Sequence, residues 1–267
     1  SSTSYSNLVE GSHSFQVKAT DEAGNTGSPD YHNWTIDITD PIATISTGPD
    51  SLTNSQSATF AFSSNEDDST FECKLDTSSW SNCTSSTSYS NLAEGSHSFQ
   101  VKATDEAGNT GSSDYHNWTI DITDPITTIS SGPDVLTNVQ SATFAFTSNE
   151  DDSTFECKMD TGSWSSCTSP ISYSNLAEDS HSFQVKAIDE AGNTGSPDYH
   201  NWTIDITDPI ITISSSVGDL TNNQTAVFTL SSNEDNSTLE CKLDYSNWAD
   251  CDSPKTYTGL SEGSHTF

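Results

Sequence analysis

The sequence contains no arginine and few cations of any kind. Its 7 basic residues, all lysine, face 39 Asp and Glu residues, so the formal net charge at pH 7 is -32. Proteins bind nucleic-acid phosphates and anionic lipid headgroups through clustered cations, which this composition does not supply. We therefore expect no nucleic-acid partner, and we expect the acidic surface to attract metal cations instead.

The sequence also lacks long apolar runs and helical periodicity. No apolar stretch approaches the roughly 18–20 residues that a membrane helix needs, so we expect no membrane insertion in this segment. The 11 Phe, 8 Tyr and 6 Trp residues recur at regular positions, unlike the apolar residues of a disordered acidic chain. This regularity indicates a folded chain.

A pattern of 84 residues repeats along the chain. The recurring tyrosines, which illustrate the interval, are Tyr5, Tyr89, Tyr173 and Tyr257. Self-similarity at a fixed period indicates an array of like structural units. We place the boundaries at the Asp-Pro steps, which predicts full repeats at 41–124 and 125–208. The flanking segments, 1–40 and 209–267, are then the C-terminal half of one repeat and the N-terminal part of another.

The incomplete flanks leave two interpretations of the chain. In the first, it is a window from a longer array. In the second, it is a filament subunit whose half-domains are completed head to tail by strands from other copies. Neighbouring repeats or further copies of the chain are the partners that these two interpretations imply.

The apolar residues within a repeat alternate with polar ones. Ala58, Phe60 and Phe62 share one face of an extended segment, and the other segments of a repeat alternate in the same way. This period of 2 predicts half-buried antiparallel strands. The strands are expected at 42–46, 57–63, 70–75, around Trp80, near Tyr89, and at 97–105 and 117–122. Seven strands in about 84 residues predict an all-β array of seven-stranded β-sandwich repeats.

The six cysteines form three pairs, each ten residues apart: Cys73 and Cys83, Cys157 and Cys167, and Cys241 and Cys251. A metal site is the alternative, but no CxxC motif or histidine lies beside them. We therefore predict disulfides, each contributing roughly 2–3 kcal/mol by closing a short loop. Disulfides are typical of an oxidising, extracellular setting.

One ordered pattern resembles a known family. It includes Phe-Glu-Cys-Lys-Leu-Asp at 71–76, Trp80, Cys83, Tyr89, and the Leu92, Gly95, His97 series. The pattern resembles the bacterial Ig-like repeats of large secreted and surface proteins, and the last series is similar to a corner of fibronectin type III modules. The resemblance implies Ig-like, fibronectin type III-like sandwiches on the cell surface or outside the cell. Such repeats mostly act as spacers.

The resemblance favours a structural or adhesive role, as a surface stalk, an adhesin shaft or a filament. The alternative is a module that binds carbohydrate or a cell-surface protein, for which the candidate aromatic residues are Trp80, Trp164 and Trp248. No enzyme is expected. Histidines such as His97 and His116 recur in every repeat, which is typical of structure rather than catalysis, and no Gly-x-Ser-x-Gly elbow is present.

Acidic residues gather where one repeat should meet the next. Strand order brings the linker before a repeat close to two loops of that repeat, and calcium takes 6–8 oxygen ligands. The alternative is that these acids are solvated turn residues. The candidate calcium ligands are Asp37, Asp40, Glu66, Asp67, Asp68, Asp105, Glu106, Asp121, Asp124, Glu150, Asp151, Asp152, Asp189 and Glu190.

Three Asn-Trp-Thr sequences match the acceptor motif for N-glycosylation. They begin at Asn33, Asn117 and Asn201. The tryptophan is expected to face inward, so the asparagine before it faces outward. A glycan is therefore sterically possible at each.

Overall fold

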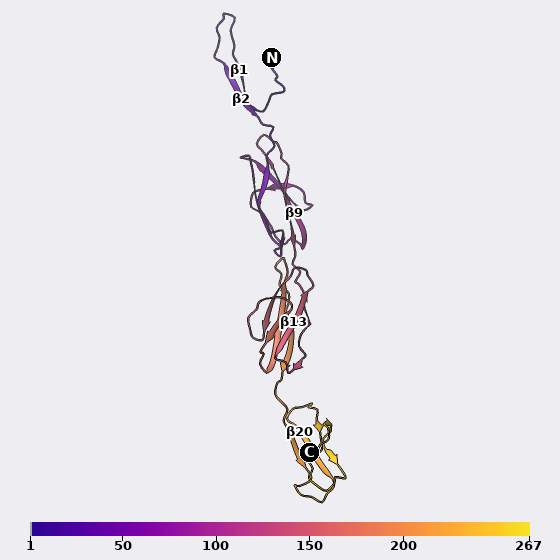
Figure 1. Cartoon of the computed structure of the whole chain (residues 1–267). Coiled ribbons are helices and arrows are strands. Elements are labelled where there is room, and N and C mark those ends of the chain that lie inside the picture. Colours follow the sequence, from indigo (N-terminus) through magenta and orange to yellow (C-terminus); the bar gives the residue numbers. More distant parts are fainter. Residues whose placement is uncertain (1) are drawn as a thin grey trace. The chain divides into compact units, whose positions relative to one another are not determined.

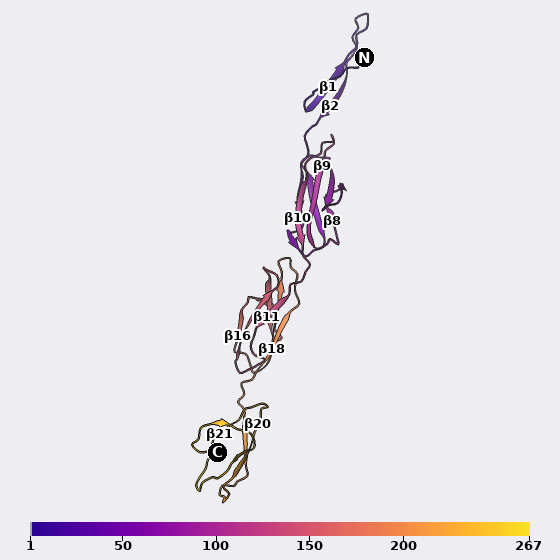
Figure 2. The same ribbon diagram turned by 90° about the vertical axis from the view of Figure 1, so that its right-hand side faces the viewer.

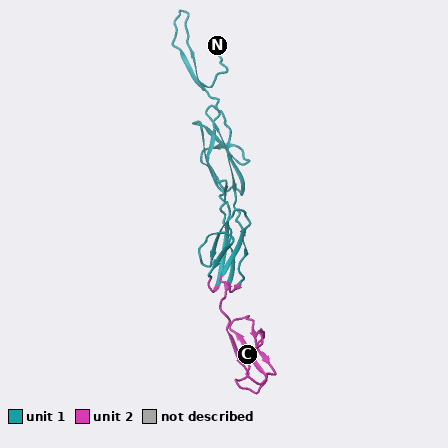
Figure 3. Cartoon of the chain, in the orientation of Figure 1, with its two compact units in different colours: residues 1–135, 141–175, 180–202 teal, residues 136–140, 176–179, 203–267 magenta. Residues whose placement is uncertain are grey.

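The computed structural model describes residues 2–267, and every regular element in that range is a β-strand (Figure 1). The all-β fold expected from the alternating pattern is therefore confirmed. None of the described residues forms a helix long and apolar enough to cross a membrane. The chain divides into two compact units, 1–135 with 141–175 and 180–202, and 136–140 with 176–179 and 203–267 (Figure 3).

Residues 41–124 form a sandwich of two sheets, called here the first module (Figure 2). The smaller sheet has the order β3-β5-β8 and the larger has the order β4-β10-β9-β6-β7. The strands are β3 (Ala43–Thr47), β4 (Leu52–Thr53), β5 (Ala58–Ser64), β6 (Thr70–Leu75), β7 (Ser81–Cys83), β8 (Thr87–Tyr89), β9 (Gly95–Thr104) and β10 (Asp114–Ile120).

The core of this module consists of the apolar halves of the alternating strands. Phe60 from β5 and Phe99 from β9 are fully buried, and their rings stack with centroids 4.0 Å apart. Trp118 and Ile120 of β10 complete this core with 2% and 0% exposure. Burying side chains of this size contributes roughly 1.5–3 kcal/mol each.

The first module has one more strand than the sequence predicts. After the strand expected at 42–46, the chain turns at Gly48, and β4, which the sequence pattern did not indicate, pairs in parallel with β10 in the other sheet. A side chain at Gly48 would come within 3.0 Å of the His116 ring, which itself hydrogen-bonds the Pro49 carbonyl. The turn at Gly48 therefore moves the chain from one sheet to the other.

Residues 125–208 repeat both sheet orders, as β11-β13-β16 and β12-β18-β17-β14-β15. Their strands are β11 (Thr127–Ser131), β12 (Leu136–Thr137), β13 (Ser141–Ser148), β14 (Thr154–Met159), β15 (Ser165–Cys167), β16 (Ile171–Ser174), β17 (Asp179–Ile188) and β18 (Asp198–Ile204).

The remaining segments contain fewer strands. Residues 2–40 form one antiparallel hairpin of β1 (Gly11–Val17) and β2 (Asp30–Ile36). Residues 209–267 contain β19 (Ile211–Ser215), β20 (Ala226–Ser232), β21 (Glu240–Cys241), β22 (Ala249–Asp250) and β23 (Lys255–Tyr257). They pair as β19-β20-β23 and β21-β22.

The cysteines form the three disulfides that their spacing predicts. Cys73 in β6 bonds to Cys83 in β7, and the equivalent pairs are Cys157–Cys167 and Cys241–Cys251. The Cα atoms of each pair are 5.8 Å apart, within the range that a disulfide spans. Each bridge ties the edge strand of the sheet to its neighbour.

Candidate metal centre

The loop after β9 is built around the carboxylate of Asp105. One carboxylate oxygen accepts the backbone N–H groups of Gly108 and Asn109, at 2.7 and 2.8 Å, and the other accepts the Asn109 side-chain amide at 2.7 Å. Gly108 has φ +95°, which glycine adopts without strain. This is the turn chemistry considered for the sequence, and it places Asp105 with only 8% exposure.

The hydrogen bonds keep Asp105 ionised. Burial raises the pKa of its carboxyl, but the hydrogen bonds from Asn109 and then Gly108 more than offset this, so that the pKa lies below its usual value. Asp189 has the same donors in the second repeat, Gly192 and Asn193. Both loops therefore hold a buried carboxylate rigidly in place.

Asn109 connects this loop to the linker that precedes the module. Its side-chain amide donates to the backbone carbonyl of Asp37 at 3.1 Å, across 72 residues of sequence. The equivalent bond in the next repeat runs from Asn193 to the carbonyl of Asp121 at 2.8 Å. Sequence reasoning misses this role, because Asn109 has the pattern of an ordinary turn residue.

The linker is also connected to the hairpin that precedes it. The Thr39 backbone N–H donates to the Asp37 carboxylate at 3.0 Å, and the Thr39 hydroxyl donates to the Glu10 carboxylate at 2.8 Å. On the other side, the Ile42 N–H donates to the side-chain oxygen of Asn65 at 2.5 Å. The linker is therefore held by residues before and after it.

Two acidic clusters result from these connections. In the first, oxygens of Asp37, Glu66 and Asp105 lie within 4.8 Å of one another, and Asp121, Glu150 and Asp189 form the second with the same limit. Each cluster takes one residue from the linker and one from each of two loops. All six residues are among the calcium ligands that the sequence predicts.

The other eight predicted ligands are exposed and lie outside both clusters. They are Asp40, Asp67, Asp68, Glu106, Asp124, Asp151, Asp152 and Glu190. Asp68 has φ +57°, so it serves the turn between β5 and β6. Asp40 still acts on the first cluster, because its charge helps to raise the pKa of Glu66.

The glutamate of each cluster has a raised pKa. Burial first, and then the charges of Asp37 and Asp105, raise the pKa of Glu66 above its ordinary value of 4.5. The same causes, with Asp121 and Asp189 as the neighbours, raise the pKa of Glu150. The ion pairs of the described residues join lysines or histidines to other acids, and none includes a cluster residue.

The cluster dimensions suit one hard cation. Two oxygens on opposite sides of a calcium ion, each about 2.4 Å from it, are about 4.8 Å apart. The carboxylates of each cluster fit within that span. At Glu234, the equivalent of Glu66 in residues 209–267, one carboxylate oxygen is buried with no hydrogen-bond partner in the described range. Such an oxygen lacks the donor or cation that normally compensates its burial.

The aromatic residues proposed for ligand binding are covered by lysines. Lys74 and Lys102 lie over the Trp80 ring, with their ammonium nitrogens 5.4 and 4.9 Å from its centroid. Lys102 also pairs with Glu72 at 2.8 Å. Trp164 has two lysines in the same positions, and Trp248, with one lysine, is 61% exposed.

The three sequon asparagines, Asn33, Asn117 and Asn201, are exposed on β2, β10 and β18. Glycosylation at these positions stays a prediction.

Comparison with known proteins identifies part of the chain. Residues 35–122 match the bacterial Ig-like domain family. The fibronectin(III)-like modules of Clostridium thermocellum CbhA are 14% identical, covering 61% of this chain and 94% of theirs, with a TM-score of 0.39. A tetra-tandem repeat from the extending region of a large adhesion protein is 20% identical, covering 96% of this chain and 75% of that one, with a TM-score of 0.30. The comparison with curated proteins found no match. The resemblance expected from the sequence is confirmed over residues 35–122, the part of the chain that matches the bacterial Ig-like domain family.

Proposed function

We propose that this chain is a structural, non-enzymatic segment of an extracellular protein, in which Ig-like modules hold an adhesive or other functional part away from the cell. The observation that carries the proposal is the pair of linker contacts, Asn109 to Asp37 and Asn193 to Asp121. A spacer needs defined connections between successive modules, and these bonds fix each linker against the module that follows it.

The cysteines support the extracellular location. All six are paired, and the described residues contain no free cysteine. Disulfides persist in oxidising compartments and are rare in the cytosol. The test is labelling of intact cells with an antibody against residues 41–124, together with a thiol assay on unreduced protein. Labelling only after permeabilisation, or free thiols in the native protein, would contradict the location.

We further propose that each acidic cluster binds one calcium ion. Asp37, Glu66 and Asp105 would supply ligands from the linker and two loops of the first module, with solvent completing the coordination. The pKa of Glu66 is raised by burial and by the neighbouring carboxylates, and a bound divalent cation would offset both effects. It also joins the linker to the module more strongly than hydrogen bonds alone, so that the orientation of the linker becomes less variable.

Calorimetric titration of the chain with calcium tests this second proposal, with magnesium as the comparison ion. Calcium at 100 times its Kd should stabilise the native protein by about 2.7 kcal/mol. Glu66→Gln with Glu150→Gln should abolish most of the binding heat. The matched control, Asp67→Asn with Asp151→Asn, removes the same charge from exposed turns and should leave it. Absence of binding would refute the calcium sites and leave the surface-labelling test of the spacer unaffected.

A further inference from the structure

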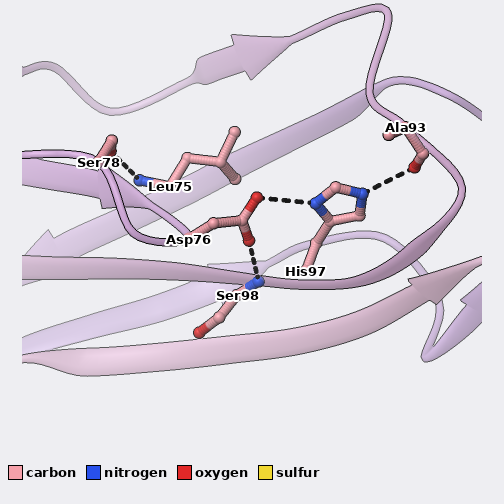
Figure 4. Close-up of polar contacts among 6 residues, drawn as sticks. All are labelled: Leu75, Asp76, Ser78, Ala93, His97 and Ser98. Atoms are coloured by element: carbon pink, nitrogen blue, oxygen red, sulfur yellow. Dashed lines mark hydrogen bonds and ion pairs between the residues drawn. The ribbon is translucent and has the colours of Figure 1, made fainter.

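The imidazole ring of His97 lies between two hydrogen-bond acceptors. Its Nδ1 is 2.9 Å from a carboxylate oxygen of Asp76, and its Nε2 is 2.8 Å from the backbone carbonyl of Ala93 (Figure 4). The Trp118 ring stacks on it with centroids 5.3 Å apart. His265 repeats the arrangement with Asp244 at 2.9 Å and the Ser261 carbonyl at 2.9 Å.

This arrangement requires a proton on both ring nitrogens. A carboxylate and a carbonyl oxygen accept hydrogen bonds and donate none, whereas a neutral imidazole carries one N–H group and one acceptor nitrogen. A neutral ring therefore satisfies one of the two contacts and sets a nitrogen lone pair against an oxygen in the other. Only the imidazolium form makes both hydrogen bonds.

The two contacts join segments that are far apart in sequence. Asp76 follows β6 at φ +52°, and its second oxygen accepts the Ser98 N–H at 2.8 Å. Ala93 lies in the corner before β9, next to Glu94, whose carboxylate accepts the hydroxyl of the linker residue Thr123 at 2.9 Å. His97 therefore connects the end of β6 to the corner that contacts the following linker.

Solvent protons can reach this group. The His97 side chain is 9% exposed and Asp76 is 38% exposed, and both line an open hollow of about 450 Å³ with Ser51 and Asn117. Asp76 is the charged side chain that faces the ring. From β10 the ring meets Trp118, and from the corner it meets the Ala93 carbonyl, with Glu94 one residue further on.

We propose that His97, Asp76 and the Ala93 carbonyl form a proton-dependent clasp, closed when the ring is protonated and weakened when it is neutral, and that His265 forms a second one. The clasp makes the corner before β9, and its contact with the following linker, sensitive to pH near neutrality. An extracellular protein meets such changes directly, whereas cytosolic pH is held nearly constant.

The sign of the effect follows from the ring's environment. The hydrogen bond to Ala93 raises the pKa of His97 above its usual 6.5, and the bond to Asp76 adds to this, while burial opposes it. A raised pKa of a histidine in the folded state means that the stabilisation is fully present below pH 6.5 and is lost as the pH rises through the folded-state value. The corner should therefore open more often at pH 8.5 than at pH 6.

The test is NMR of the whole chain, labelled with ¹⁵N, between pH 6 and 8.5. The ¹⁵N shifts of both His97 ring nitrogens should show the imidazolium at pH 6. Protection of the Leu92 and Ser98 amides from exchange, corrected for intrinsic rates, should fall by up to about tenfold per pH unit between pH 6.5 and the folded-state pKa, and should level off above it. A neutral ring at pH 6, or constant protection across the range, would overturn the proposal.

Asp76→Asn is the matched variant. The asparagine oxygen can still accept the Ser98 N–H, and its amide can donate to Nδ1 of a neutral ring, so the clasp should lose its dependence on pH. Protection at Leu92 and Ser98 should then stay constant from pH 6.5 to 8.5. Amides near His116, whose Nε2 contact with the Pro49 carbonyl is satisfied by a neutral ring, provide the internal reference. An unchanged pH dependence in the variant would refute the role of Asp76.

Discussion

Replacing Gly111 by alanine should destabilise the first module more than adding a methyl group at any other position in it. A Cβ atom at Gly111 would lie 1.7 Å from the backbone oxygen of Pro41 and 2.9 Å from its carbonyl carbon, well inside the 3.0 Å limit of real Cβ contacts. Pro41 is fully buried, and the Gly111 N–H is bonded to the Ala103 carbonyl at 3.1 Å. Neither the backbone at Pro41 nor that at Gly111 can move without disrupting the packing of the first residues of the module.

The expected cost is therefore at or above the upper end for overpacking, about 3 kcal/mol or more. For a module of this size it corresponds to a fall in Tm of roughly 12 °C or more. Differential scanning calorimetry of the whole chain should show one transition moving down while the others remain. Gly27→Ala is the matched control, because its nearest neighbour is the Ala19 oxygen at 3.8 Å. Equal effects of the two substitutions would refute the reasoning.

Three further predictions concern the disulfides and the acidic clusters. Replacing Cys73 and Cys83 together by alanine should lower the stability of the first module by about 2–3 kcal/mol, measured by the same calorimetry; an unchanged Tm would contradict it. The pKa of Glu66 is raised above 4.5, so the folded state holds its proton more tightly and the calcium-free protein should gain stability as the pH falls from 7 towards 4.5. Thermal melts at each pH measure this gain, and Glu66→Gln should reduce it. Saturating calcium should raise the Tm of the native chain and of Asp67→Asn but raise that of Glu66→Gln less; equal increases would exclude Glu66 as a ligand.

Much of the fold could be predicted because it depends on residue alternation. Phe60, Phe62 and Phe99 lie on the buried faces that period 2 indicates, with 0–3% exposure. The strand β4 was missed because it has two residues, Leu52 and Thr53, and forms by parallel pairing with β10. Pairing of so short a segment depends on tertiary contacts rather than on any local pattern.

The candidate site was predicted in part for a related reason. Strand order alone brings Asp37, Glu66 and Asp105 to one place, and the structure does the same. Strand order does not specify which acids in a turn point inward, so exposed residues such as Asp67 could not be separated from Glu66. The role of Asn109 depends on side-chain reach across a linker, which sequence spacing does not encode.

For His97, the sequence indicates the kind of role but not its chemistry. Recurrence of His97 in each repeat indicated a structural hydrogen bond, and the structure supplies two, to Asp76 and Ala93. Which acceptors meet the ring depends on the positive φ of Asp76 and on the corner conformation. The need for a charged ring becomes visible only when both distances are known.

The most direct test of the spacer proposal is the distance at which the chain holds its neighbours from the cell. Residues 125–208 would be deleted from the full-length protein in its own host, and immunogold labels would mark a segment beyond the deletion. A strand such as β9, of 10 residues, spans about 33 Å, so the labels should move closer to the cell by roughly 35–40 Å while surface display is retained. An unchanged distance, or loss of a specific ligand-binding activity with the deleted module, would contradict the account.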